Sequence, residues 1–316
     1  MNVKPKVVFS GVSGDPVTTI PGVVSPKTSK ATYQWYKGPI DIAGAKTASY
    51  SPATADQGFK IYANVKFSAK GFVDNKVDSN EIEIPVVKRT YVQVWQDEFN
   101  GSSLSQNWVY DIGTGNSGWG NNELQYYTNQ NAVVSDGLLQ ITAKQEAMGG
   151  QNYTSSRIKT QGIQSWKYGR IDIRAALPKG QGIWPALWML GDNINTVSWP
   201  ACGEIDIMEH VGRDLNKIIS AFHYPVYYGS NAKVATTMVP TATTEFHVYK
   251  LEWTPASMQI FVDDKLFHTL PNSPSIPYNQ NFFLILNIAM GGNLGGPIDP
   301  SFTSTTFEID YVRVYQ

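Results

Sequence analysis

Gly203-Glu204-Ile205-Asp206-Ile207-Met208-Glu209-His210-Val211-Gly212 decides the fold, because it places three carboxylates among aliphatic residues within six positions. On a β-strand, Glu204 and Asp206 face one side while the isoleucines that follow them face the other. Glu209 is out of phase with this alternation by one residue. A β-bulge around residues 207–208 would add one residue and restore the phase. The stretch therefore predicts a bulged strand with all three carboxylates on one face.

The crowded carboxylates predict a chemical role for this strand. Like charges on one strand face destabilise a sheet and raise the pKa of at least one of the groups. A solvent-facing charged strand is the alternative, and the apolar alternation on both sides of the stretch disfavours it. Two carboxylates on one curved strand lie roughly 5–7 Å apart. That spacing is close to the separation of about 5–5.5 Å found in retaining glycosidases.

Glycoside hydrolysis with retention needs two carboxyl groups that have different tasks. One carboxylate attacks the anomeric carbon, and the other protonates the leaving oxygen and then deprotonates water. Asp206 lies between the two glutamates, where its charge and hydrogen bonds can keep one neighbour protonated. The three groups would titrate as a coupled set. The residues themselves leave open whether Glu204 or Glu209 is the nucleophile.

The composition limits the classes of protein to which the chain can belong. Its 316 residues suffice for one large or two ordinary domains. The net charge of −1 argues against a nucleic-acid-binding surface, and no apolar run is long enough to span a membrane. The single cysteine, Cys202, allows neither an intrachain disulfide nor a cysteine-based metal site. Few charged and many aromatic residues suit an all-β protein with an aromatic-lined groove.

Residues 1–88 are expected to form a small separate domain of short antiparallel strands. Tyr33-Gln34-Trp35-Tyr36 is typical of a core strand, and residues 61–67 alternate cleanly. This segment carries 11 basic and 7 acidic residues, whereas the remainder carries 14 and 19, which supports two units. With Trp35 as its core tryptophan, the segment resembles the cysteine-free immunoglobulin-like modules of bacterial surface and secreted enzymes. Since no exposed aromatic trio is evident, we expect a spacer or stabilising β-sandwich rather than a carbohydrate-binding module.

Residues 89–316 carry eight of the nine tryptophans and strand patterns throughout. Alternating or continuously apolar runs recur at residues 138–143, 169–175, 248–253, 258–262, 282–288 and 307–315. Asp263-Asp264-Lys265 predicts a hairpin turn between two strands, and no stretch has the periodicity of a convincing amphipathic helix. So many short strands in one domain predict a two-sheet sandwich of jelly-roll type.

Aromatic and amide residues near the acidic stretch fit a sugar ligand. Trp184 and Trp199 each precede a proline at an expected strand end, where the rim of a cleft would lie. Trp188 belongs to the same apolar run as Trp184. Tryptophan rings are large, rigid and apolar, so they can stack on the C–H face of a pyranose, although any of the three could instead pack in the core. The Gly-rich loop Gly118-Trp119-Gly120-Asn121-Asn122-Glu123 is a candidate reader of sugar hydroxyl groups, with a plain turn as the alternative.

Five stretches in collinear order give a specific resemblance to glycoside hydrolase family sixteen across residues 95–316. They are Asp97-Glu98-Phe99-Asn100, Trp119-Gly120-Asn121-Asn122-Glu123-Leu124-Gln125-Tyr126-Tyr127, Leu177-Pro178-Lys179-Gly180-Gln181-Gly182-Ile183-Trp184-Pro185-Ala186, Glu204-Ile205-Asp206-Ile207-Met208-Glu209 and Tyr311-Val312-Arg313-Val314-Tyr315. The acidic signature is in its bulged form, which resembles endo-1,3-β-glucanases (laminarinases) more than lichenases, whose signature is shorter. The resemblance implies an all-β jelly roll with a concave cleft and a retaining mechanism.

The resemblance also implies roles for individual residues. Glu204 would be the nucleophile, Glu209 the acid/base and Asp206 the assisting carboxylate. The resemblance makes five residues candidates for sugar binding: Asn122, Arg157, Trp184, Trp188 and Trp199. Trp119 of the Gly-rich loop and His223 are further candidates. Catalysis would need no cofactor.

A structural calcium ion is a further implication of the resemblance. The matching positions are Glu98 and Gly137, which would bind the ion through backbone carbonyls, and Asp310, which would bind it through its side chain. Ligation by oxygen alone suits a hard cation. The alternative is that Asp310 merely caps a strand end.

Two stretches depart from the family pattern. After Phe222-His223 the family usually shows Gly-Pro-Gly, whereas this chain has Tyr224-Pro225-Val226-Tyr227-Tyr228-Gly229. The bulkier tyrosines could narrow one side of the cleft, and His223 could contact the nucleophile or a bound sugar, or be an ordinary packed histidine. Asn293-Leu294-Gly295-Gly296 lacks the tryptophan that is common after that asparagine. These departures leave the number of subsites and the substrate preference open.

We therefore expect a secreted or cell-surface endo-β-1,3-glucanase that acts as a monomer on laminarin-type polysaccharide, without nucleic-acid or membrane partners. The first residues lack the apolar core of an export signal, so such a signal would lie outside this sequence. The alternatives are a same-fold hydrolase of mixed-linkage glucan or of an algal galactan such as agar, and a non-hydrolytic glucan-binding protein. Retention of both Glu204 and Glu209 disfavours the last of these.

Overall fold

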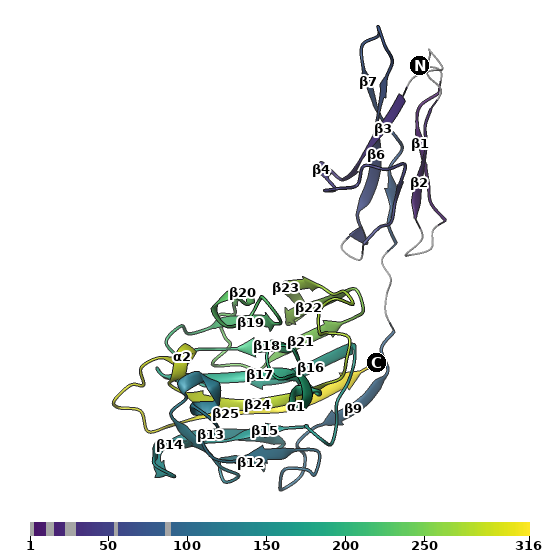
Figure 1. Cartoon of the computed structure of the whole chain (residues 1–316). Helices are drawn as coiled ribbons and strands as arrows, with labels where there is room; N and C mark the ends of the chain where they lie inside the picture. Colours follow the sequence, from purple (N-terminus) through teal and green to yellow (C-terminus); the bar gives the residue numbers. More distant parts are fainter. Residues whose placement is uncertain (1–2, 11–15, 23–29, 54–55, 86–89) are drawn as a thin grey trace. The chain divides into compact units, whose positions relative to one another are not determined.

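The structure, a computed structural model, describes residues 3–10, 16–22, 30–53, 56–85 and 90–316 (Figure 1). The chain divides into two compact units, Met1–Thr90 and Tyr91–Gln316. Each unit has a hydrophobic core of its own. The domain boundary expected at residues 88 and 89 lies outside the described residues.

The first unit contains two antiparallel sheets, with strand orders β1-β2-β5 and β4-β3-β6-β7, and β8 pairs with β6. The strands are β1 Lys6–Val8, β2 Val17–Ile20, β3 Lys30–Lys37, β4 Ile40–Asp41, β5 Ser49–Tyr50, β6 Lys60–Ser68, β7 Asn75–Asp78 and β8 Ile82–Glu83. The two stretches predicted as strands lie within β3 and β6. Trp35 on β3 is fully buried in this core, and its indole N–H donates to the carbonyl of Thr47 at 2.9 Å.

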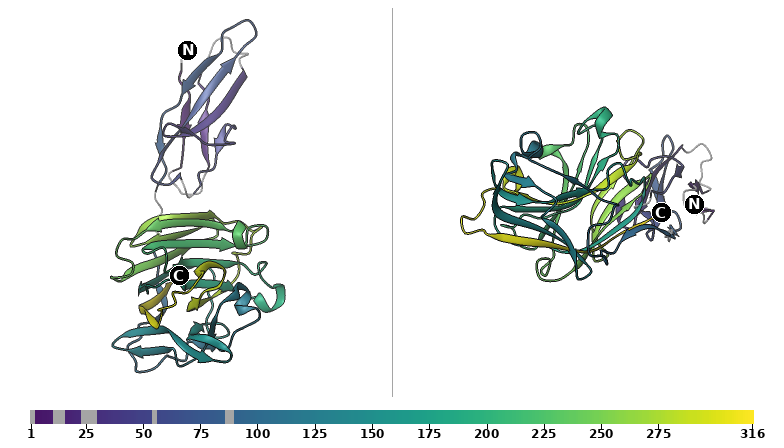
Figure 2. Two further views of the ribbon diagram at one scale, coloured as in Figure 1. Left: turned by 90° about the vertical axis from the view of Figure 1, so that its left-hand side faces the viewer. Right: turned by 90° about the horizontal axis from the view of Figure 1, so that it is seen from below.

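The second unit is a sandwich of two large sheets, seen as curved layers in Figure 2. The seven-stranded sheet has the order β10 Val109–Asp111, β15 Arg157–Lys159, β24 Phe282–Met290, β17 Ile183–Gly191, β18 Glu204–Glu209, β19 Lys217–His223 and β20 Lys233–Met238. The ten-stranded sheet has the order β11 Gln125–Tyr127, β14 Gln151–Ser155, β13 Leu138–Met148, β25 Ser304–Tyr315, β16 Gly169–Ala176, β21 His247–Trp253, β22 Ser257–Val262 and β23 Lys265–Pro271, with β9 Gln93–Asp97 on β25 and β12 Ala132–Ser135 on β13. This architecture confirms the predicted all-β jelly roll.

The core of the second unit lies between these two sheets. Alternate side chains of each strand enter it, because successive residues of a strand face opposite sides. Ile205 and Ile207 of β18 are fully buried in this core together with Phe222 and Leu286. The same alternation sends the neighbouring residues of β18 to the outer face of the seven-stranded sheet.

The connections agree with the turn chemistry of the sequence. Asp263 and Asp264 join β22 to β23 with φ of 47° and 64°, and two successive positive φ angles are what a type I′ hairpin turn requires. In the described part of the chain the α-helices are the single turns α1 Ile194–Val197 and α2 Gly292–Gly295. None of the helices in the described ranges has the length and apolar character needed to cross a bilayer.

Candidate active site

The acidic strand β18 carries the predicted bulge. On one side Met208 pairs with Leu187 and Asp206 with Trp188, so that Ile207 is an extra residue. On the other side β18 also gains one residue against β19 between Asp206 and Glu209. This extra residue restores the phase of Glu209, so the bulge aligns it with the other two acids as the sequence predicted.

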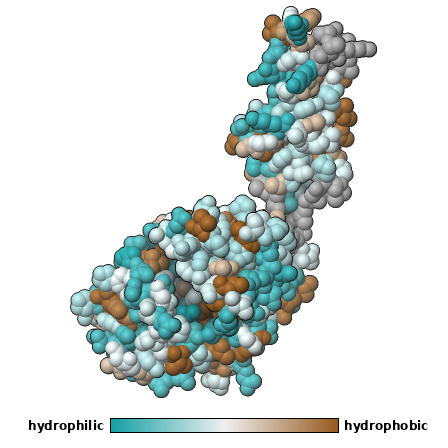
Figure 3. Space-filling view, viewed as in Figure 1, coloured by the Kyte–Doolittle hydropathy of each residue, from teal (hydrophilic) through white to brown (hydrophobic). Residues whose placement is uncertain are grey.

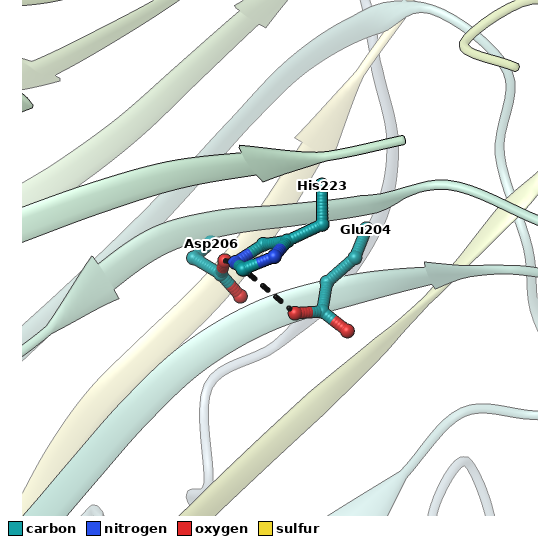
Figure 4. A group of neighbouring side chains, drawn as sticks. All are labelled: Glu204, Asp206 and His223. Atoms are coloured by element: carbon teal, nitrogen blue, oxygen red, sulfur yellow. Dashed lines mark ion pairs between the residues drawn. The ribbon is translucent and has the colours of Figure 1, made fainter. Parts of the chain in front are cut away.

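Glu204, Asp206 and His223 meet on the outer face of the seven-stranded sheet (Figure 4). Glu204 pairs with His223 across β18 and β19. His223 Nε2 lies 3.2 Å from Asp206 Oδ2 and 3.6 Å from Glu204 Oε1. The contact with Asp206 has ion-pair distance but not hydrogen-bond alignment, so this buried oxygen has no aligned donor among the described residues.

The tautomer of His223 follows from its second ring nitrogen. The backbone N–H of Gly229 donates to His223 Nδ1 at 3.1 Å. Because Nδ1 accepts a hydrogen bond, the ring of a neutral His223 carries its proton on Nε2. That N–H faces the carboxylates, where it can interact with the negative charge of Glu204 and Asp206.

Burial raises the pKa of all three carboxyl groups to about 8, because a low-dielectric surrounding disfavours their ionised forms. The charge of Asp206 raises the pKa of both glutamates further. His223 and Arg157 act in the opposite direction on Glu204. Trp184 does the same for Glu209, because its indole N–H donates to Glu209 Oε1 at 2.9 Å. The three groups titrate together, and the site therefore retains at least one proton well above the usual range of a carboxyl group.

Arg157 is held between two tryptophans predicted to bind sugar. Its guanidinium carbon lies 4.7 Å from the ring centre of Trp119 and 4.9 Å from that of Trp188. Arg157 Nε lies 3.0 Å from Asp111 Oδ2, and Lys159 Nζ lies 2.6 Å from the other oxygen of Asp111. The arginine thus occupies part of each ring face, and the two tryptophans are oriented by a cation as well as by packing.

The remaining sugar-binding candidates lie in different surroundings. Trp188 also donates its indole N–H to Asn287 Oδ1 at 2.8 Å. Trp199 is 42% exposed, and its ring centre lies 5.9 Å from that of His223. Asn122 Nδ2 donates to Asn293 Oδ1 at 2.9 Å, which ties the Gly-rich loop to α2. Figure 3 shows a hollow in the surface of the second unit, with hydrophobic and hydrophilic residues both at its rim.

Two residues of the site were not predicted from the sequence. Asp111 pairs with Arg157 across β10 and β15. Its acidic side chain at the end of a short strand is the only feature of the sequence that could have pointed to it. Tyr228 was noted only as part of a bulky segment, yet its ring lies 5.3 Å from that of Trp199. Both contacts join residues that are distant along the chain, so no local pattern marks them.

The strand register places the segments that carry the three expected calcium ligands next to the same strand, β25. Val312 of β25 pairs with Asp97, and Ile309 of β25 pairs with Leu139. Glu98 directly follows Asp97, and Gly137 lies two residues before Leu139, so both lie near the part of β25 that contains Asp310. Asp310 Oδ2 accepts a hydrogen bond from Arg174 Nη1 at 2.5 Å, and its other oxygen accepts none from the described residues. The donor set thus fits an oxygen-ligated cation, with Arg174 competing for one carboxylate oxygen.

Comparison with known proteins agrees with this geometry. The family model for glycosyl hydrolases family 16 matches residues 120–313. The chain is 45% identical over 243 residues to a beta-glucanase of Rhodothermus marinus (71% of this chain, 84% of that protein). It is 38% identical over 250 residues to a glucan endo-1,3-beta-glucosidase of Cryptopygus antarcticus (71% and 91%). The laminarinase catalytic domain of Thermotoga maritima superposes with a TM-score of 0.69 at 40% identity, covering 72% of this chain and 99% of that one. These similarities agree with the bulged acidic strand on a jelly roll. The chain therefore belongs to glycosyl hydrolase family 16.

Proposed function

We propose that this glycoside hydrolase is a retaining endo-β-1,3-glucanase that cleaves internal bonds of laminarin-type polysaccharide. The observation that carries the proposal is the bulge in β18, which aligns Glu204, Asp206 and Glu209 on one face. The names of the relatives, a glucan endo-1,3-beta-glucosidase and a laminarinase, support the substrate. Hydrolysis of mixed-linkage glucan is the second candidate, because one relative is named only as a beta-glucanase.

In this mechanism Glu204 is the nucleophile. Its side chain is 17% exposed, against 6% for Asp206, and His223 and Arg157 both favour its ionised form. The charges of Asp206 and Glu209 oppose this effect, and burial raises the pKa of all three groups to about 8. The electrostatics therefore do not separate the two glutamates, and the nucleophile is assigned by the match of Glu204 to the family signature. The Glu204 carboxylate attacks the anomeric carbon and forms a covalent glycosyl-enzyme.

Glu209 is the acid/base in the same proposal. Its raised pKa keeps it protonated at neutral pH, so it can protonate the glycosidic oxygen as the bond breaks. After the sugar leaves, the Glu209 carboxylate takes a proton from the water that hydrolyses the intermediate. Asp206 lies between the two glutamates on β18. Whether it is ionised or protonated changes the pKa of each glutamate, so the three groups titrate as a coupled set.

The sugar-binding residues fall into three groups under this proposal. Trp119, Arg157 and Trp188 form one wall, with Asp111 as the residue that positions Arg157. Trp184 lies beside the acid/base, and Trp199 lies beside His223 at the nucleophile. Asn122, on the Gly-rich loop, is proposed to form a hydrogen bond with a sugar hydroxyl group.

A side-by-side assay of four polysaccharides tests the function. We expect release of reducing ends from laminarin and curdlan, a lower rate on lichenan, and none on agarose. Cleavage confined to mixed-linkage glucan would refute the β-1,3-glucanase proposal, and binding of laminarin without hydrolysis would favour a glucan-binding protein. The measurement is reducing-end release under initial-rate conditions, with product sizes resolved to separate internal from terminal cleavage.

For the first unit we propose an immunoglobulin-like β-sandwich over residues 1–88 that serves as a spacer or stabilising domain. Its two sheets and the buried Trp35 support this assignment. The same four-substrate assay, repeated on residues 91–316, separates a spacer from a binding module. A loss of activity confined to insoluble curdlan would contradict the spacer. We also propose that the protein is secreted or displayed at the cell surface and acts as a monomer.

A structural calcium ion at Glu98, Gly137 and Asp310 is proposed on the register of β25. Removing it with EDTA should lower the unfolding temperature, because an ion that binds only the folded state at about 100 times its Kd stabilises by roughly 2.7 kcal/mol. The initial rate on laminarin at 25 °C should not change, because the ion would not contact the three carboxyl groups of β18. Asp310→Asn is the matched control and should unfold at the same temperature with and without EDTA. An unfolding temperature of the natural protein that ignores both EDTA and added calcium would contradict the site.

That assay also addresses the three side chains of Glu204, Asp206 and His223. Their ligand atoms lie within 4.8 Å of one another, a spacing that could hold a cation. If a cation took part in hydrolysis there, EDTA would lower the rate on laminarin at every temperature. The retaining mechanism proposed here predicts no such loss, since the two glutamates supply the nucleophile and the proton.

A further inference from the structure

Two loops from distant parts of the chain meet at the Glu204 end of the acidic strand. Trp199 lies shortly before β18, and Tyr228 lies shortly after β19. The two strands are antiparallel with Glu204 opposite His223, so both loops leave the sheet at the same end. The rings of Trp199 and Tyr228 lie 5.3 Å apart with their planes at 84°.

The side chains of Trp199 and Tyr228 are more exposed than the tyrosines near them in the chain. Trp199 is 42% exposed and Tyr228 is 45% exposed. Tyr224 is buried against Tyr278 and Tyr227, and the ring of Tyr227 also lies under Lys233 Nζ at 3.5 Å. Tyr224 and Tyr227 thus have packing roles, whereas the ring of Tyr228 contacts only Trp199 among the described aromatic pairs. Two half-exposed aromatic faces beside a carboxylate cluster are a surface suited to a ligand.

The segment that presents Tyr228 has a fixed backbone. The N–H groups of Tyr224 and Tyr227 donate to each other's carbonyls at 2.8 and 2.9 Å, and Asn231 Nδ2 donates to the carbonyl of Val226 at 2.8 Å. Val226 has a φ of 75°, a conformation that is a genuine outlier for a β-branched residue. Such strain persists only where the surroundings determine the conformation, and it clusters at functional sites. Tyr228 is therefore placed by a defined turn, not by a loose loop.

The same segment also touches the catalytic cluster. Gly229, the residue after Tyr228, donates its N–H to His223 Nδ1 at 3.1 Å, and His223 Nε2 lies 3.2 Å from Asp206 Oδ2. The side chain of Tyr228 and the backbone of Gly229 thus have separate roles, one at the surface and one at the imidazole. A side-chain substitution at Tyr228 that keeps the backbone should leave the imidazole in place.

We propose that Trp199 and Tyr228 form a two-sided glucosyl-binding subsite, in which Tyr228 selects a β-1,3-linked chain over a straight one. Each ring offers an apolar face to the C–H face of a pyranose. A β-1,3-linked glucan turns at every linkage, whereas consecutive β-1,4 linkages give an extended ribbon. Two faces at nearly a right angle match consecutive sugars of a chain that turns. This inference rests on the proposed endo-β-1,3-glucanase function and adds a residue that sets its linkage preference.

The test is a comparison of Tyr228→Ala and Tyr228→Phe in the full-length protein. We expect Tyr228→Ala to raise KM for long laminari-oligosaccharides about five- to tenfold, with kcat within about twofold, because one stacked aromatic face is lost. Tyr228→Phe keeps the ring and should behave as the natural protein. The ratio of kcat/KM on laminarin to that on lichenan should fall in Tyr228→Ala by a similar factor.

Chain length and a double mutant sharpen the test. The effect of Tyr228→Ala should be absent for the shortest cleaved oligosaccharides and appear once a sugar reaches the subsite. Trp199→Ala combined with Tyr228→Ala should raise KM by less than the product of the single effects, since both rings would hold the same chain. The unfolding temperature of each variant, measured alongside, identifies a fold defect, in which case Tyr228→Leu replaces the alanine variant.

Two outcomes would overturn the inference. One is an unchanged KM and unchanged linkage ratio in a folded Tyr228→Ala. The other is a loss of kcat that is equal at all chain lengths, which would mean that Tyr228 acts only through Gly229 and His223. Failure of the natural protein to hydrolyse laminarin would instead refute the proposed function, so the two failures are distinguishable.

Discussion

Glu204→Gln is expected to lower kcat on laminarin by at least about 10³-fold, because the glycosyl-enzyme intermediate cannot form without a carboxylate nucleophile. Gln keeps the size of the side chain and leaves Asp206, Glu209 and His223 in place. The loss should be equally severe for substrates with good and poor leaving groups, since attack on the anomeric carbon is missing in both. Reducing-end release and laminarin binding should be measured together, with binding retained.

The free energy of unfolding of Glu204→Gln is the control, because it shows that the variant is folded and that Glu204 was buried. The pKa of Glu204 is raised in the folded protein from 4.5 to about 8, so the folded state binds a proton more tightly than the unfolded state. Between these two pKa values the free energy of unfolding falls as the pH rises. Glu204→Gln removes this contribution and should be more stable than the natural protein at pH 8, by roughly 1–3 kcal/mol, and nearly equal at pH 4. Undiminished hydrolysis by a folded Glu204→Gln would eliminate the proposed role.

The bulge was predictable because it follows from counting residues along one strand. A side-chain period of two leaves Glu209 on the wrong face of a regular strand, and only an inserted residue reconciles three buried carboxylates with a continuous apolar face. The pairings of Trp188 with Asp206 and of Leu187 with Met208 place that insertion at Ile207. The prediction used local information alone, and the local pattern was sufficient.

The wall around Arg157 was not predictable in the same way. Alternation along β15 and β17 indicates which faces Arg157 and Trp188 occupy, but not that an arginine lies between Trp119 and Trp188. That arrangement depends on the register of β10 against β15, which brings Asp111 opposite Arg157. Register across strands that are some 45 residues apart in the chain is a tertiary property, and no local periodicity encodes it.

The segment after His223 shows a third case. Its departure from the family pattern is visible in the sequence, where the bulkier tyrosines could narrow one side of the cleft. Their individual roles depend on burial, because Tyr224 is buried while Tyr228 is 45% exposed. The hydrogen bond from Gly229 to His223 depends on a turn with a positive φ at Val226, which a sequence containing valine would not suggest.

Glu209→Gln is expected to lower kcat on laminarin by about 10²–10⁴-fold, the usual contribution of a general acid. Unlike the nucleophile variant, it should regain activity on an aryl β-laminaribioside whose leaving group needs no protonation. With such a substrate the glycosyl-enzyme still forms, but its hydrolysis lacks a general base. Pre-steady-state kinetics should therefore show a burst of released phenol followed by a slow phase, which Glu204→Gln cannot show.

The pH profile gives an independent assignment of the same residue. In the proposed mechanism the active form has Glu204 ionised and Glu209 protonated, and burial raises the pKa of Glu209 to about 8. As the pH rises through this value the acid loses its proton, so kcat/KM on laminarin should fall on the alkaline side, and coupling to Asp206 should broaden the limb. In Glu209→Gln the alkaline limb should disappear with the aryl substrate, because formation of the intermediate then needs only ionised Glu204. Added azide should restore turnover of this variant and give a β-glycosyl azide, since azide attacks the intermediate from the face that Glu209 occupied. An α-glycosyl azide from Glu209→Gln, or an unchanged alkaline limb, would mean that the two glutamates have exchanged roles.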